Sequence, residues 1–146
     1  MTALLGVTAP ALSTARADAA TSDMTRQLTD VAAELEALVA ADDATPNGDA
    51  RRVVDIRLPA RTYTSAGVSS LQFRERAGVG VATWQVESRA QTERLVDVPI
   101  RPTAPARTVT EPGTHRLVFA LTRADGRRVL TVHRFKPDAA ASAGHA

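Results

Sequence analysis

The feature that most constrains this fold is a heptad-spaced run of large apolar residues between positions 17 and 41. The spacing of four, three, four and three residues places them on one narrow stripe of an α-helix, which turns once every 3.6 residues. We therefore predict an amphipathic helix over residues 17–41, with a stripe that must be buried. The stripe consists of Met24, Leu28, Val31, Leu35 and Leu38.

Two partners could bury this stripe. The helix could pack against the remainder of its own chain, as amphipathic helices of globular proteins do. It could instead pack against the helix of a second copy or another protein, since three heptads approach the minimum for a coiled coil. We keep both interpretations, and we take the five stripe residues as the candidate seam for helix assembly.

The segment before the helix, Met1–Ala15, is uncharged and rich in Ala, Leu and Val. As a helix it would span about 22 Å, which is short of the roughly 30 Å hydrocarbon core of a bilayer. We expect residues 1–16 to be an apolar leader or a truncated membrane segment, with a translation start placed too late. The alternatives are the apolar region of a cleaved signal and a frayed leader on a soluble protein.

Residues 51–136 are predicted to form a β-domain, because apolar and polar residues alternate in short runs that are separated by turn signals. We predict an α+β fold: the N-terminal apolar or amphipathic helix, then a small antiparallel β-sandwich or curled sheet of about six strands. Residues 137–146, rich in Ala, Gly and Ser, are predicted to be a disordered tail. The six predicted strands cover residues 51–58, 69–76, 78–87, 94–100, 114–123 and 127–135.

The last two strands form the strongest local prediction. They flank Asp125-Gly126, and such a pair favours a type I′ turn, in which both central residues have positive φ. A two-residue loop would pair Leu121 with Leu130, both apolar. The same register would place Arg123 opposite Arg128, which is a small repulsion. The large aromatic residues expected in the core are Phe73, Trp84, Phe119 and Phe135.

Chemical motifs are sparse. The chain has no cysteine, which excludes disulfides, thiolate metal sites and a cysteine nucleophile. In the predicted hairpin register His115 and His133 face opposite sides of the sheet, and we expect both on the strand surface. No Gly-rich phosphate loop or catalytic triad spacing is evident. We therefore expect no enzymatic activity, no metal and no cofactor.

The charge distribution is uneven but mild. The net charge is +2, with residues 1–73 at −3 and residues 74–146 at +5 by count of the same sequence. Nucleic-acid modules show a basic stripe with interleaved aromatic residues, whereas aromatics are only 3% here. No nucleic-acid partner is expected.

Several further segments are distinctive when they are taken together: Thr2–Val7 with Pro10 and Ala15-Arg16, Arg51–Val54 with Arg57-Leu58-Pro59, Ala66-Gly67-Val68 and Glu111–Leu117. On these segments the chain resembles a small uncharacterised family of halophilic archaea. The resemblance implies an N-terminal apolar helix, a β-rich domain and an association with type IV pilus-like or secretion loci, and it brings no catalytic residues.

The sequence thus favours a membrane-anchored, pilin-like or cell-envelope component that assembles through its N-terminal helix and exposes an extracytoplasmic β-domain. Expected partners are the membrane, through the N-terminal segment, and like chains or pilus or secretion components, through the helix. The alternative is a secreted β-sandwich that binds an acidic polymer with its basic face after signal cleavage.

Overall fold

A computed structural model describes residues 2–41, 50–103 and 108–135. One 40-residue helix, α1 (Thr2–Ala41), is followed by eight strands within these residues. The predicted leader and amphipathic helix are therefore one continuous helix. The predicted tail, 137–146, lies outside the described residues. The strands are β1 (Ala50–Leu58), β2 (Ser70–Arg76), β3 (Val79–Val86), β4 (Arg89–Val96), β5 (Ile100–Pro102), β6 (Thr108–Val109), β7 (Gly113–Ala124) and β8 (Arg127–Arg134).

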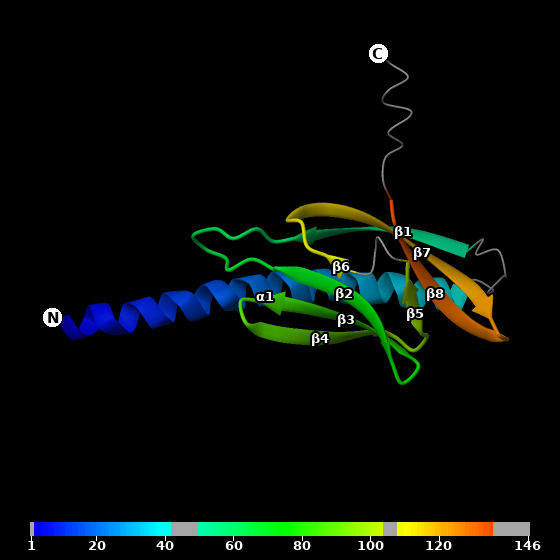
Figure 1. Ribbon diagram of the computed structural model, residues 1–146, viewed down its shortest axis with the longest axis horizontal. Coiled ribbons are helices and arrows are strands. Elements are labelled where there is room, and N and C mark those ends of the chain that lie inside the picture. Colours follow the sequence, from blue (N-terminus) through cyan, green and yellow to red (C-terminus); the bar gives the residue numbers. More distant parts are fainter. Residues whose placement is uncertain (1, 42–49, 104–107, 136–146) are drawn as a thin grey trace, which may run out of the picture.

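The strands form two four-stranded sheets instead of the expected six-stranded arrangement (Figure 1). Sheet A has the order β1-β7-β8-β5, and sheet B has the order β4-β3-β2-β6. All pairings are antiparallel except that of β5 with β8, which is parallel. The sequence-based prediction of a wholly antiparallel fold is corrected at this one pairing.

The extra strands arise where the chain passes between the sheets. The strand predicted over residues 94–100 is split: its first part ends β4 in sheet B, and Ile100 begins β5 in sheet A. Pro99 lies between the two strands, and its carbonyl accepts a hydrogen bond of 2.8 Å from the amide of Leu130 in β8. β6 has only two residues, which is too short for an alternation of apolar and polar residues to predict a strand.

The β7–β8 hairpin is confirmed in turn type and register. Asp125 and Gly126 both have positive φ, 52° and 76°, and Leu121 pairs with Leu130. Arg123 does lie opposite Arg128. The Arg128 guanidinium, however, donates a hydrogen bond of 3.1 Å to the carbonyl of Val39 near the end of α1. A cation at a helix C-terminus is favourable, so this contact offsets the cross-strand repulsion.

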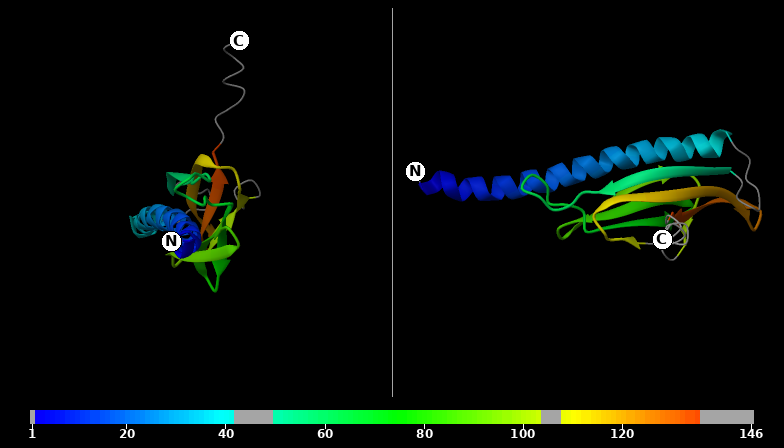
Figure 2. Two further views of the ribbon diagram at one scale, coloured as in Figure 1. Left: turned by 90° about the vertical axis from the view of Figure 1, so that its left-hand side faces the viewer. Right: turned by 90° about the horizontal axis from the view of Figure 1, so that it is seen from above.

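The core lies between the two sheets and is closed on one side by α1. The helix contacts β1 and β4, which are the edge strands of the two sheets on that side (Figure 2). Across the core, Phe73 of sheet B and Phe119 of sheet A meet edge to face, with ring centroids 5.6 Å apart. Trp84 is buried as expected, but Phe135 is 47% exposed, because it follows the end of β8.

The N-terminal part of α1 extends beyond both sheets (Figures 1 and 2). From Ala11 to Ala15 every side chain is exposed, and from Ala11 onward the first buried side chain is that of Ala20. Charged side chains occur from Arg16 onward, so α1 as a whole is not the apolar helix that was expected.

Among the described residues, no helix has the length and hydropathy required to cross a membrane.

Replacing a stripe residue should destabilise the whole chain. We expect Leu28→Ala, at a side chain with no exposed surface, to lower the free energy of unfolding by about 2–5 kcal/mol. Ser22→Ala, on the exposed face of the same helix, should change it by less than about 0.5 kcal/mol. Urea unfolding of both variants measures the difference, and equal effects would contradict burial of the stripe.

A surface ion pair on sheet A should give a small acid sensitivity. Arg116 hydrogen-bonds the carboxylate of its cross-strand partner Asp55 at 2.9 Å, and this bond holds the pKa of Asp55 below its usual value. The pair therefore adds stability above the ordinary aspartate pKa of about 3.9, and this is lost as pH falls through the lower native pKa. Asp55→Asn should lower the urea midpoint slightly at pH 7 and not in strong acid. A deficit that persists in acid would contradict this assignment.

Candidate functional site at the junction of the helix and the sheets

The two histidines within the described residues, His115 and His133, do not come together in one site. His115 and His133 lie on opposite faces of sheet A, as predicted from the hairpin register. His115 is only 6% exposed, so its expected place on the strand surface is wrong. Within the described ranges, no three His, Cys, Asp or Glu side chains are grouped so that they could hold a metal.

His115 instead fastens the turn before β7 to the end of β8. Its Nε2 lies 2.6 Å from the carbonyl oxygen of Glu111, and its Nδ1 lies 2.8 Å from Nη2 of Arg134. A guanidinium can only donate, so Nδ1 accepts and Nε2 donates to the carbonyl. Arg134 also donates to the Glu111 carboxylate at 3.2 Å. Both ring nitrogens are thereby engaged in structural contacts.

All five candidate seam residues are buried in the common core. Met24, Leu28, Leu35 and Leu38 have no exposed surface, and Val31 retains 3%. Of the two partners considered for the stripe, the sheets of the same chain are the one that the structure shows. The structure therefore makes these residues the joint between α1 and the β-rich part.

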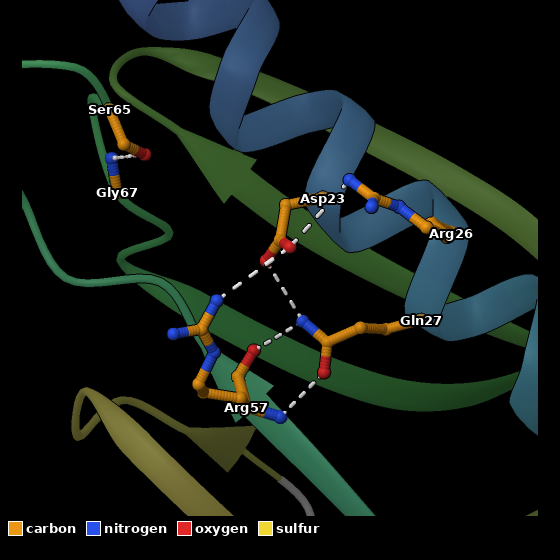
Figure 3. Close-up of polar contacts among 6 residues, drawn as sticks. All are labelled: Asp23, Arg26, Gln27, Arg57, Ser65 and Gly67. Carbon is orange, nitrogen blue, oxygen red and sulfur yellow. Dashed lines mark hydrogen bonds and ion pairs between the residues drawn. The ribbon is translucent and has the colours of Figure 1, made fainter.

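A second, polar joint binds α1 to the edge of sheet A. The Gln27 side chain accepts a hydrogen bond from the Arg57 amide and donates one to the Arg57 carbonyl, both at 2.7 Å (Figure 3). Arg57 lies in β1, an edge strand. An edge strand presents unpaired backbone groups that can recruit another strand. The carboxamide of Gln27 occupies two of these groups as a neighbouring strand would.

Asp23 holds this carboxamide in place. One carboxylate oxygen accepts a hydrogen bond of 3.0 Å from Nε2 of Gln27. The other forms ion pairs with the Arg57 side chain at 3.7 Å and with Arg26 at 4.0 Å (Figure 3). Asp23 and Gln27 are four residues apart and therefore neighbours on the helix surface. The joint is thus a short network in which one turn of α1 contacts both the backbone and the side chain of Arg57 in β1.

A third joint lies where α1 leaves the sheets, and the loop of residues 59–69 forms it. The Ala66 amide donates to the Arg16 carbonyl at 3.0 Å, and Nε of Arg16 donates to the Tyr63 carbonyl at 2.7 Å. Gly67 has φ of +76°, and a Cβ there would lie 2.8 Å from the Arg61 amide nitrogen. The glycine therefore permits the tight return of this loop along the helix.

The exit of α1 also carries exposed apolar surface. Leu12 is 48% exposed, one helical turn before Arg16, and Tyr63 in the neighbouring loop is 89% exposed. On the side of the β3–β4 turn, a polar cavity of about 320 Å³ opens between α1 and the sheet. Ser13, Thr14, Asp18, Thr21, Ser88 and Arg89 line this cavity, among others.

The stripe was predicted from the sequence, whereas the two polar joints were not. Gln27 lies outside the stripe, and nothing local shows that its carboxamide meets the backbone of a strand 30 residues later. Residues 59–68 fall between two predicted strands, but nothing in their sequence shows that they return along α1.

The Gln27 joint should be measurable at a single amide. Gln27→Ala should accelerate hydrogen exchange of the Arg57 amide, which loses its acceptor, and lower stability by about 1 kcal/mol. NMR-detected exchange resolves this position. Gln85→Ala, at an exposed side chain of β3, serves as the matched control. Unchanged protection of Arg57 in Gln27→Ala would show that the carboxamide does not cover the strand edge.

A family model described as "Domain of unknown function (DUF7311)" matches residues 1–135. No curated protein and no solved structure matches the chain.

Proposed function

Since the chain belongs to the DUF7311 family, whose description assigns no function, we propose its role from its architecture. We propose a non-enzymatic, pilin-like component of the cell envelope that assembles through its N-terminal helix and exposes its β-rich part. The N-terminal segment of α1, residues 2–15, would form the shaft, and the two sheets would form the head.

The observation that carries this proposal is the division of α1 into two parts. The part that includes the stripe is buried against the sheets. Residues 2–15 carry no charge, residues 11–15 are exposed, and the N-terminal end of the helix extends beyond the sheets (Figure 1). Isolated helices of this length are marginal in water, because most helical stability in proteins comes from tertiary packing. An uncharged helical segment of four turns at the end of α1 would therefore gain stability from a partner.

The partners that suit this segment are like segments of other copies and the acyl region of a bilayer. Its sequence is rich in Ala, Leu and Val and contains no charge that would have to be desolvated. The stripe residues then serve assembly indirectly, because they fix the head at a constant position on the shaft. The same reasoning gives the proposed location: the helix at the membrane and the β-rich part outside the cytoplasm.

The resemblance to proteins of halophilic archaea near type IV pilus-like or secretion loci supports the same role, and we extend it to this chain as part of the proposal. The C-terminal part of α1 is packed against the sheets, and its N-terminal end extends beyond them. Such a helix suits a subunit that packs side by side with its neighbours. Regular packing needs this fixed relation of head to shaft.

The exposed Leu12 offers a direct test. In the wild-type chain we expect oligomers by sedimentation velocity, or flotation with lipid vesicles containing phosphatidylglycerol. Leu12→Asp should abolish both, because it places a carboxylate in the apolar contact, while thermal unfolding of the head stays unchanged. Leu12 is outside the buried core.

The matched control is Val53→Asp, which places the same charge on an exposed valine of β1. This variant should assemble like the wild-type chain. A wild-type chain that neither self-associates nor floats would contradict the proposal, and so would Leu12→Asp oligomers of wild-type strength. Those outcomes would favour the second candidate, a secreted module that binds an acidic polymer.

A further inference from the structure

The outer face of sheet B carries a basic patch formed by Arg74 and Arg76 of β2 and Arg94 of β4. All three side chains are exposed. We propose that this patch, defined by these three arginines, is a binding face for an acidic polysaccharide. The ligand class is the one that the second candidate function requires. The patch lies on sheet B and not on the N-terminal segment of α1, so the inference does not depend on assembly.

The sheet register gathers the arginines into one area. Arg74 of β2 pairs with Val81 of β3, and Val81 pairs on its other side with Arg94 of β4. Arg74, Val81 and Arg94 therefore form a row across the sheet. Strand spacing then separates the Arg74 and Arg94 backbones by about 10 Å, and Arg76 lies about 7 Å from Arg74 along β2. A linear polymer with repeated negative charges can contact all three at once.

The valine between the arginines indicates how their side chains lie. Val81 points outward from sheet B, like its paired neighbours, yet it is only 6% exposed. The flanking Arg74 and Arg94 are the residues placed to cover it with their aliphatic stems, as long basic side chains commonly do over apolar surface. Stems that lie over Val81 hold the guanidinium groups at the surface, which lowers the entropy lost on binding.

The positive charge of the patch comes mainly from Arg74 and Arg76. Glu75 and Glu93 fall on the opposite side of the sheet by strand alternation. Arg94 is paired with the exposed Asp97 and interacts electrostatically with Glu36 of α1, whereas neither Arg74 nor Arg76 has an ion-pair partner among the residues that the structure describes. Two guanidinium groups are thus free to bind carboxylate or sulfate in the bidentate geometry that Arg favours.

The neighbouring row supplies neutral hydrogen-bonding groups. Gln72 donates to the Thr108 hydroxyl at 3.3 Å, and the Thr83 and Thr92 hydroxyls are also 3.3 Å apart. These four residues are paired in one line across all four strands, from β6 to β4. Hydroxyl and amide groups next to guanidinium groups match a polymer that carries both hydroxyls and acidic groups.

The lack of aromatic side chains on this face distinguishes between polyanions. Within the described strands of sheet B, the aromatic residues are Phe73 and Trp84, and both are buried in the core. Proteins that bind single-stranded nucleic acids stack bases on exposed aromatic rings. The patch therefore favours a sugar polymer over a nucleic acid.

The test is binding of the full chain to alginate and to dextran sulfate, with neutral dextran and an oligo(dT) strand as comparisons. We expect binding to one or both acidic polysaccharides that weakens as salt rises, and none to dextran. The double variant Arg74→Gln/Arg76→Gln should weaken the binding at least tenfold. Arg123→Gln/Arg127→Gln removes the same charge from the β7–β8 turn and should leave it within twofold.

Three results would overturn the inference. Equal losses in the two double variants would show a response to net charge alone. Equal binding to neutral dextran would show that the arginines do not select the ligand. Tighter binding to oligo(dT) than to both polysaccharides would assign the face to nucleic acid. Sedimentation of the same samples keeps the outcome separate from assembly, because the Arg74→Gln/Arg76→Gln variant retains Leu12 and the whole of α1.

Discussion

The whole structure depends on burial of one helical stripe along the open side of two sheets. The stripe of α1 packs against β1 and β4, the edge strands of the two sheets on that side, and so closes the core between the sheets. Each fully buried Leu or Met contributes about 1.5–3 kcal/mol of hydrophobic free energy. Because net stability of a domain is only about 5–15 kcal/mol, the helix and the sheets must fold as one unit.

Polar contacts then fix where along this seam the helix sits. A hydrophobic stripe by itself tolerates sliding by a heptad, since each register buries similar surface. The Gln27 carboxamide on the Arg57 backbone and the Ala66 amide on the Arg16 carbonyl each join one helical position to one point of the β-rich part. The N-terminal segment of α1 therefore leaves the sheets at a defined residue. The proposed regular assembly would require this fixed position of the helix relative to the sheets.

The two proposed activities use different parts of the molecule. The proposed assembly involves the uncharged N-terminal segment of α1. The arginine patch lies on the outer face of sheet B, and the glutamates of the same strands lie on the opposite face. The acids of the first half of the sequence include Asp30, Glu34 and Glu36 on the exposed side of α1, and Glu36 interacts electrostatically with Arg94 of the patch. A head that binds polysaccharide and a shaft that packs with its neighbours are compatible in one envelope component.

By itself the sequence determined the elements whose signals are local: the stripe, read from a 3.6-residue period, and the β7–β8 hairpin, read from Asp125-Gly126 and its flanking alternation. Tertiary structure alone decided what buries the stripe, because a heptad pattern does not distinguish a neighbouring sheet from a second helix. It also decided the passage of the chain between sheets at Pro99, the parallel β5–β8 pair and the grouping of Arg74 with Arg94. Those depend on contacts between residues distant in sequence, which no local pattern encodes.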